Sequence, residues 1–331
     1  MGERFQVVVT DLLDDDLAPE REVLGDVADI MALQARSEAE LVGRVEHADA
    51  LIVYHEITVT RITIERVKKC RVIVRGGVGF DNVDGASARQ RGIPLVNVPD
   101  YGSEEVADSA LGLLLALTRG ISVANSRLRG GDHEWSYKVA APLVRLRGRV
   151  LGIVGLGRIG TAMAVRGKAL GMDVAFYDPY KPDGYDKALG IRRVESLREL
   201  LAQSLAVSLH CPLTDETTRM INAESLAVMP AGSYLINTAR GGLVNTGDVL
   251  AALDSGHLAG VGIDVLEKEP PAENDPLILA WRDPHHAAHH RLIINPHIAW
   301  YCEEGKREVR QKAALACRRA LLGLPLRNVV N

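Results

Sequence analysis

The residues best suited to chemistry in this sequence are a histidine, an arginine and a glutamate in its second half. His297 follows an apolar run that ends at Pro296, and Arg240 follows another that ends at Asn237. Histidine can exchange a proton at neutral pH, and arginine can hold a carboxylate and polarise a carbonyl. Glu269 would stabilise a protonated His297 if their loops converge. A structural salt bridge is the alternative interpretation of Arg240.

A glycine-rich loop, Gly155 to Gly160, follows a strand-like run and opens a helical pattern. Gly155 permits a tight turn, Gly157 lets the backbone approach a pyrophosphate, and Gly160 permits close helix packing. The following helix N-terminus favours phosphate. Asp178 ends the next strand about twenty residues on, where a carboxylate accepts hydrogen bonds from the ribose hydroxyls and repels a 2′-phosphate. The loop predicts an NAD site, and with the acid/base candidates it predicts hydride transfer.

Two other groups of residues have weaker functional interpretations. Cys211 ends a strand beside the expected cofactor groove, but no activating base has the required spacing, so we expect cofactor packing and not a nucleophile. The stretch between Trp281 and Leu292 is an irregular polar insertion, for which we expect a solvated loop and no metal site. Its histidines resemble a metal-binding cluster at first sight: His285, His286, His289 and His290.

Short β-branched runs alternate with helical segments along the chain, which predicts parallel sheets with crossover helices. We therefore expect an α/β fold with two doubly wound, Rossmann-like or flavodoxin-like domains. A long helix with an apolar face is expected over Ser103 to Arg119, and a terminal helix to about Leu322. That helix would return to the first domain, giving a discontinuous domain of residues 1–100 plus 301–331 and a second of 101–300. The expected strands are 5–9, 50–53, 71–74, 149–154, 173–176, 205–209, 233–236, 260–264 and 292–294.

Composition narrows the class of protein. The 331 residues, 47% of them hydrophobic, suffice for two domains. The net charge of −4 is spread along the chain, so we expect a small-molecule partner and no direct nucleic-acid partner. Four cysteines without a disulfide or zinc spacing favour a reducing, cytoplasmic compartment. The longest apolar stretch, residues 111–117, is too short to span a membrane.

Taken together, these features resemble the D-isomer-specific 2-hydroxyacid dehydrogenase family, most closely its C-terminal-binding-protein branch, over essentially the whole chain. The resemblance implies two domains with the active site in the cleft between them, NAD as cofactor, a small 2-oxo or D-2-hydroxy acid as substrate, and a homodimer. The motifs that carry it occur in order: Arg75-Gly-Gly-Val-Gly-Phe-Asp-Asn82, Gly155 to Gly160 with Phe176-Tyr-Asp-Pro179, His210-Cys-Pro-Leu-Thr214, Asn237 to Val244, Asp264 to Pro270, and Pro296-His-Ile-Ala-Trp-Tyr301.

The same resemblance implies roles for individual residues. Arg240 binds the substrate carboxylate and oxo oxygen, His297 is the acid/base, and Glu269, rather than Glu267, is its partner. Contacts with NAD are implied for Val154, Gly155, Leu156, Gly157, Arg158, Ile159, Gly160, Asp178, His210, Cys211, Pro212, Thr217, Thr238, Ala239, Arg240, Asp264 and His297. Contacts with substrate are implied for His55, Arg75, Gly77, Val78, Gly79, Arg240, His297 and Trp300.

The resemblance also implies that Trp300 shapes the substrate pocket with His55 and Arg75, and such an aromatic wall suggests room for an apolar or thioether-bearing side chain. Glyoxylate, hydroxypyruvate and 3-phosphoglycerate remain alternative substrates, and an NAD(H)-sensing dimeric corepressor-like scaffold is the alternative class of function. The apolar face of the long helix, formed by Leu111, Leu114, Leu115 and Leu117, favours a homodimer. An ordinary intramolecular core is the other explanation of that face.

Overall fold

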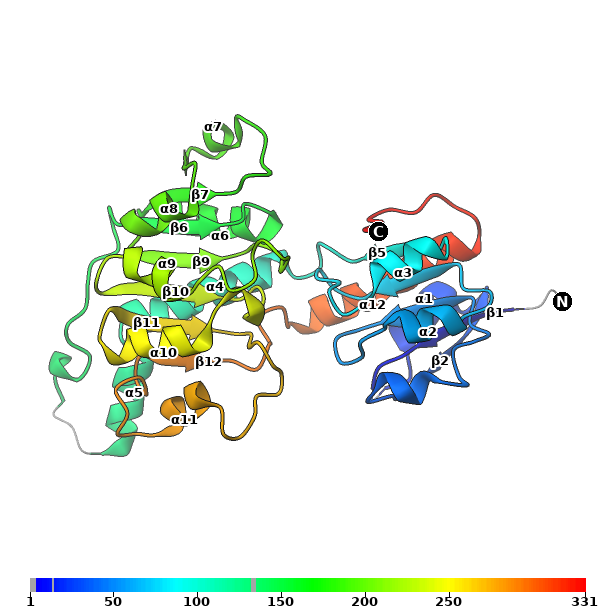
Figure 1. Cartoon of the computed structure of the whole chain (residues 1–331), viewed down its shortest axis with the longest axis horizontal. Helices are drawn as coiled ribbons and strands as arrows, with labels where there is room; N and C mark the ends of the chain where they lie inside the picture. The colour runs from blue at the N-terminus through cyan, green and yellow to red at the C-terminus, as the bar shows by residue number, and fades with distance from the viewer. Residues whose placement is uncertain (1–3, 14, 132–134) are drawn as a thin grey trace. The chain divides into compact units, whose positions relative to one another are not determined.

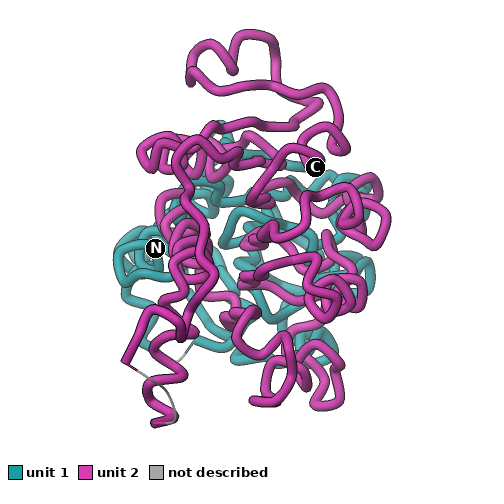
Figure 2. Tube along the Cα trace, turned by 90° about the vertical axis from the view of Figure 1, so that its left-hand side faces the viewer, with its two compact units in different colours: residues 1–102, 301–331 teal, residues 103–300 magenta. Residues whose placement is uncertain are grey.

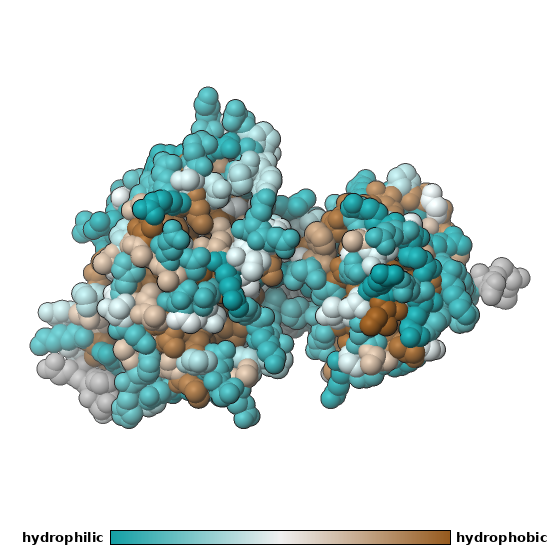
Figure 3. All heavy atoms as spheres, in the orientation of Figure 1, coloured by the Kyte–Doolittle hydropathy of each residue, from teal (hydrophilic) through white to brown (hydrophobic). Residues whose placement is uncertain are grey.

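The computed structural model describes residues 4–13, 15–131 and 135–331. The chain forms two compact units, shown in different colours in Figure 2. Unit 1 combines residues 1–102 with residues 301–331, and unit 2 is residues 103–300. Within each unit in Figure 1, helices lie beside a central sheet. In the view of Figure 3, hydrophilic residues cover much of the visible face of each unit, with hydrophobic residues in scattered groups.

Unit 1 contains a five-stranded parallel sheet in the order β2-β1-β3-β4-β5. This is the flavodoxin-like order, in which the loops after β1 and β3 flank the point where the strand order reverses. Both β3 and β4 are buried along their whole length, as expected for parallel strands covered on both faces. The strands are β1 (Phe5–Val9), β2 (Ala28–Ala32), β3 (Ala50–Val53), β4 (Val72–Arg75) and β5 (Leu95–Asn97).

Helices cover both faces of the first sheet. Alternate strand residues form two cores, one against α1 and α12 and the other against α2 and α3. A buried ion pair ties α12 to α1, because the Arg310 guanidinium, 4% exposed, bonds the fully buried Glu20 carboxylate. The helices are α1 (Ala18–Leu24), η1 (Glu38–Leu41), α2 (Arg61–Arg66), α3 (Gly85–Gln90) and α12 (Glu303–Leu321).

Unit 2 contains a seven-stranded parallel sheet in the order β12-β11-β10-β9-β6-β7-β8. The strand order reverses between β6 and β9, as in dinucleotide-binding sheets. The prediction of two doubly wound parallel sheets is therefore confirmed. The strands are β6 (Val150–Val154), β7 (Asp173–Tyr177), β8 (Arg192–Arg193), β9 (Ala206–Leu209), β10 (Ser233–Asn237), β11 (Leu258–Ile263) and β12 (Leu292–Ile294).

Two groups of helices cover the second sheet. One core joins it to α4 and α6, and the other joins it to α8, α9, α10 and α11. The helices are α4 (Ser103–Thr118), α5 (Ile121–Gly130), η2 (Tyr137–Val139), α6 (Arg158–Ala169), α7 (Tyr185–Leu189), α8 (Leu197–Gln203), α9 (Ala223–Val228), η3 (Gly241–Leu243), α10 (Thr246–Asp254) and α11 (Pro276–Arg282).

The apolar face of α4 belongs to the core of unit 2. Leu114 is fully buried, and Leu111, Leu115 and Leu117 are half-buried against the same core. A Cβ atom on Gly260 of β11 would lie 3.0 Å from the Leu117 side chain, so the helix rests directly on the sheet. Packing within the core of unit 2, the alternative to a dimer interface, thus accounts for the apolar face of this helix.

The described residues contain no single helix that is long and apolar enough to cross a membrane, although α4 and α5, bent by 59° at their junction, pass that test as a pair.

Candidate active site

The glycine loop lies between β6 and α6, as predicted. Gly155 has φ +87°, and a Cβ there would lie 2.8 Å from the Cys211 backbone nitrogen. A Cβ on Gly160 would lie 2.0 Å from the Gly155 carbonyl oxygen, so only hydrogen fits. Gly157, the N-cap of α6, has open space where its Cβ would be. The loop therefore packs tightly on its own side and leaves its outer side clear, as a phosphate cradle requires.

Asp178 stands at the end of β7 and is hydrogen-bonded to the glycine loop. Its Oδ2 accepts the Leu156 N–H at 2.8 Å, and its Oδ1 accepts the Tyr180 N–H at 3.0 Å. A carboxylate has further acceptor sites beyond these two bonds. The geometry places a negative charge beside the loop, where ribose hydroxyls could donate to it.

The segment after β9 packs against the glycine loop. The His210 N–H donates to the Val154 carbonyl at 2.7 Å. Burial raises the pKa of the Cys211 thiol to about 11, so this cysteine stays protonated and is no nucleophile. Thr217 Oγ1 donates to the Pro212 carbonyl at 2.7 Å and closes the loop that follows.

Thr238, Ala239 and Arg240 follow β10. Thr238 Oγ1 is buried, and among the described residues it has no hydrogen-bond partner. The Asn237 side chain donates to the Arg240 carbonyl at 2.9 Å and accepts the Ala239 N–H at 3.0 Å, which fixes the turn. Arg240 Nη1 bonds the Ala239 carbonyl at 2.8 Å, and the side chain is half-buried.

His297 and Glu269 form a hydrogen-bonded pair. His297 Nδ1 lies 2.7 Å from Glu269 Oε2, and the two side chains are 22% and 26% exposed. The other carboxylate oxygen of Glu269 accepts the Leu266 N–H at 2.7 Å. With Nδ1 bonded to a carboxylate, Nε2 is the ring atom suited to exchange a proton with substrate. Glu267 instead bonds Arg219 at 2.7 Å.

The three proposed catalytic residues follow three neighbouring parallel strands. Arg240 comes after β10, Glu269 after β11 and His297 after β12, and these strands are adjacent in the sheet. Carboxyl ends of parallel strands meet at one edge, the usual ligand crevice of such sheets. The fold therefore supplies the convergence of loops that the His–Glu pair requires.

Asp264 holds the turn that carries His297. Its carboxylate, 1% exposed, accepts the N–H groups of Ile298 and Ala299, each at 2.9 Å, and its carbonyl accepts the His297 N–H at 2.8 Å. His297 has φ +56°, an uncommon conformation for a non-glycine residue. Burial raises the pKa of Asp264, although both backbone bonds oppose that shift. Trp300 Nε1 donates to the His297 carbonyl at 3.0 Å.

The predicted substrate-binding residues of unit 1 follow two adjacent strands. His55 is exposed and lies just after β3, and Arg75, 7% exposed, ends β4. The Arg75 guanidinium folds over the next loop, since a Cβ on Gly77 would lie 1.5 Å from its Nη1 atom. The Val78 carbonyl accepts a hydrogen bond from the Asn97 side chain at 2.7 Å, and Gly79 follows it.

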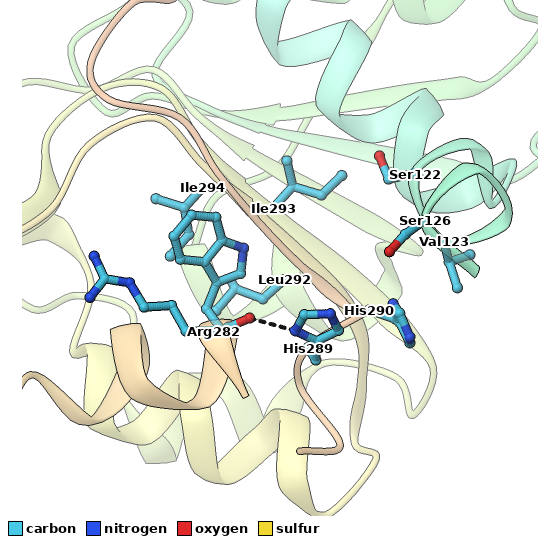
Figure 4. Close-up of a pocket in the computed structure, with 10 residues that line it drawn as sticks. Ser122, Val123, Ser126, Arg282, His289, His290, Leu292, Ile293 and Ile294 are labelled. Carbon is cyan, nitrogen blue, oxygen red and sulfur yellow. Dashed lines mark hydrogen bonds between the residues drawn. The ribbon is translucent and has the colours of Figure 1, made fainter. Parts of the chain in front are cut away.

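Two histidines of the insertion, His289 and His290, line a cavity of about 330 Å³ in unit 2 (Figure 4). His289 Nδ1 lies 2.7 Å from the Trp281 carbonyl oxygen, and the His289 and His290 rings meet edge to face. Among the described residues, the four histidines of the insertion are not part of any group of three clustered ligand atoms. The segment has no helix or strand after α11 until β12.

Two residues near the unit 1 site escaped the sequence interpretation. Asp11 and Asn82 bond the backbone of the segment 54–57 that contains His55. The available signals were an acid just after a strand and an asparagine inside a glycine-rich motif. Their partners are 25 to 46 residues away in the chain, so local patterns could not identify them.

The residues present fit NAD. The open side of Gly157, the carboxylate of Asp178 and the unpartnered hydroxyl of Thr238 all lie on segments at the carboxyl edge of the sheet. The helix N-terminus and backbone N–H groups of the loop would hold the pyrophosphate, and Asp178 the adenosine ribose.

Comparison with known proteins agrees with this geometry. Residues 111–299 match the NAD binding domain of the D-isomer specific 2-hydroxyacid dehydrogenases. The chain is 35% identical over 98% of its length to D-3-phosphoglycerate dehydrogenase of Methanocaldococcus jannaschii, and 37% identical over 93% to C-terminal-binding protein 1 of Caenorhabditis elegans. It spans only 59% and 42% of the lengths of these relatives. The structure of D-lactate dehydrogenase from Aquifex aeolicus with NAD and lactic acid has a TM-score of 0.85, at 28% identity, with 96% of each chain covered.

Proposed function

The chain belongs to the D-isomer specific 2-hydroxyacid dehydrogenase family, and we propose that it interconverts a small 2-oxo acid and its D-2-hydroxy acid, with NAD as cofactor. The observation that carries the proposal is the 2.7 Å contact of His297 with Glu269, on loops next to the one that carries Arg240. A general acid/base and a carboxylate clamp are the two protein groups that this chemistry needs.

Each residue of the proposed site has a separate role in the reaction. NAD, if held by the glycine loop and Asp178, would supply or accept the hydride at the second carbon of the acid. In the reducing direction, His297 Nε2 gives its proton to the carbonyl oxygen, and Glu269 stabilises the imidazolium that precedes this transfer. Arg240 binds the carboxylate and polarises the oxo oxygen. His55, Arg75 and the backbone of residues 77–79 are the proposed substrate contacts of unit 1.

Trp300 supports a preference for acids with an apolar or thioether side chain. Its indole is half-buried and fixed by the bond from Nε1 to the His297 carbonyl. A rigid aromatic wall beside the acid/base offers contact area to a methylene or sulfur-containing chain.

The proposal is tested by NADH oxidation with glyoxylate, hydroxypyruvate, pyruvate, phenylpyruvate, 3-phosphohydroxypyruvate and 4-methylthio-2-oxobutyrate. We expect His297→Asn to lower kcat by about 100-fold or more and Glu269→Gln by about tenfold, because each removes part of the proton-transfer machinery. NADH affinity, followed by fluorescence, should stay within about threefold, since the cofactor contacts remain.

Glu267→Gln is the matched control, because this glutamate lies in the same loop but bonds Arg219. Turnover that survives in His297→Asn would contradict the proposed acid/base. Tight NADH binding without turnover of any acid by the wild-type protein would favour the NADH-sensing scaffold instead.

We also propose a homodimer in the cytoplasm. The support is a run of exposed apolar side chains after α4, on Ile121, Leu128, Trp135, Tyr137 and Leu143, with Trp135 91% exposed. Such a concentration is typical of a surface that binds another protein.

The proposed cytoplasmic location is supported by the cysteines. All four are free thiols, which suits a reducing compartment.

A further inference from the structure

The segment 54–57 of unit 1, which carries His55, is bonded on one side by a buried carboxylate. Asp11, 2% exposed, follows β1, the neighbour of β3. Its Oδ2 accepts the Tyr54 N–H at 2.8 Å, and its Oδ1 accepts the N–H groups of Glu56 at 2.9 Å and Ile57 at 3.2 Å. Thr10 Oγ1 also donates to its Oδ2, at 2.6 Å. One carboxylate therefore satisfies three backbone donors of a loop without regular structure.

Asn82 bonds the same segment through its carbonyl groups. Its Nδ2 donates to the Tyr54 carbonyl at 2.9 Å and to the Ile57 carbonyl at 2.8 Å. Its Oδ1 lies 3.3 Å from Arg75 Nε, which donates to it. A single amide thus connects the segment that carries His55 to the guanidinium of Arg75.

The Tyr54 side chain extends this connection to the glycine loop. A Cβ on Gly76 would lie 2.4 Å from Tyr54 Cε1, so the ring lies flush against the loop backbone. The phenol donates to the buried Glu20 carboxylate at 3.0 Å, and Arg310 bonds the same carboxylate. Burial raises the pKa of Tyr54, so the phenol remains a hydrogen-bond donor at all ordinary pH values.

We propose that Asp11 and Asn82 are positioning residues that hold His55 and Arg75 in one fixed arrangement for binding the substrate. This inference rests on the proposed function. The segment lies where the strand order of the first sheet reverses, which is where ligands bind in open parallel sheets. Loops at such edges are otherwise mobile, so a pocket built on them needs hydrogen bonds that restrict them.

The position of Asn82 predicts which kinetic constant its substitution changes. The hydrogen bonds of Asn82 to Tyr54, Ile57 and Arg75 lie within unit 1, whereas the acid/base and the proposed cofactor contacts belong to unit 2. A loosened segment should therefore weaken substrate binding more than it slows the chemical step. We expect Asn82→Ala to raise KM for the preferred acid about tenfold while kcat changes less than about threefold and NADH affinity stays constant.

Asn331→Ala is the matched control, since this amide also bonds the backbone of unit 1. Its Nδ2 donates to the Ile93 carbonyl at 2.9 Å, and its Oδ1 accepts the Leu95 N–H at 2.8 Å, away from the segment 54–57. Both variants lose partly buried hydrogen bonds and should lose similar stability. Only Asn82→Ala should change KM.

Hydrogen exchange gives a readout that does not depend on turnover. The amides of Tyr54, Glu56 and Ile57 should exchange about tenfold faster in Asn82→Ala than in Asn331→Ala. Equal exchange rates of these amides in the two variants would overturn the proposal that Asn82 restrains the segment 54–57. A double-mutant cycle with His55→Ala then tests positioning, because the effect of Asn82→Ala on KM should shrink when His55 is already absent.

The outcomes separate the two proposals. Additive effects of Asn82→Ala and His55→Ala on KM would overturn the positioning role, even if hydrogen exchange shows that Asn82 restrains the segment. A wild-type protein that binds NADH but reduces no 2-oxo acid would overturn the proposed function and the kinetic role with it, and the exchange comparison would still decide whether Asn82 restrains the segment.

Discussion

At the scale of single residues, His210 shows how burial sets the charge of a side chain beside the glycine loop. Its Nε2 lies 2.8 Å from Ser208 Oγ, and burial lowers its pKa from 6.5 to about 3. The folded protein therefore keeps this imidazole neutral at physiological pH. A neutral ring can accept or donate one hydrogen bond without bringing a positive charge to the cofactor site.

The same shift makes stability depend on pH. Between pH 6.5 and about 3 the unfolded chain binds a proton at His210 and the folded chain does not, so stability present above pH 6.5 is lost as pH falls. We expect the urea midpoint of the wild-type protein to fall more steeply from pH 7 to pH 5 than that of His210→Gln. Parallel pH dependences would contradict this account.

Local sequence patterns were enough to predict where some of the proposed site residues lie, while their roles stay predictions. The glycine loop, Asp178 and His297 each follow a recognisable strand, and the structure places them at the carboxyl ends of β6, β7 and β12. Asp11 and Asn82 went unassigned because their hydrogen bonds depend on which backbone groups the fold brings near. No periodicity or spacing encodes that arrangement.

At the scale of elements, α6 illustrates how close packing limits a helix position. A Cβ on Gly160 would lie 2.0 Å from the Gly155 carbonyl oxygen, whereas Gly112, inside α4, has no atom within 4 Å of its Cβ position. Gly160→Ala should displace the start of α6, lower the free energy of unfolding by about 3 kcal/mol and weaken NADH binding.

Gly112→Ala serves as the paired control, because alanine favours a helix over glycine. This change should stabilise the protein by about 0.5–1 kcal/mol and leave NADH affinity unchanged. Urea unfolding and NADH fluorescence measure both effects. Normal NADH binding by Gly160→Ala would show that the loop tolerates the displacement.

Some elements could not be predicted because their sequences lack the strand signal. The strand β8 is two arginines at the sheet edge, and β2, Ala-Asp-Ile-Met-Ala, has no β-branched run and alternates in burial. Edge strands are short and partly solvated, so backbone pairing with the neighbouring strand decides whether they form, more than the β-propensity of their residues does. Central strands such as β3 and β4 are fully buried and β-branched, and they were predicted.

At the scale of the whole molecule, the exposed apolar segment after α4 makes the proposed dimer testable. Ile121 on α5 and Ile62 on α2 are exposed to nearly the same degree, 58% and 60%. Ile121→Glu should shift the protein toward monomer in sedimentation velocity, because a charge at an apolar interface is desolvated on association. Ile62→Glu should leave the wild-type sedimentation unchanged. A monomeric wild-type protein would refute the dimer.

The return of α12 to unit 1 has a consequence for synthesis on the ribosome. Residues 303–321 cover strand residues of β1, β3 and β4, so that core stays incomplete until α12 is translated. Unit 2 emerges whole in the meantime, which takes about 10 to 40 s at typical elongation rates. The apolar face of the first sheet must remain shielded from aggregation over this interval, and a nonsense codon at residue 301 or 302 would leave unit 2 intact and unit 1 without the helix that covers this face.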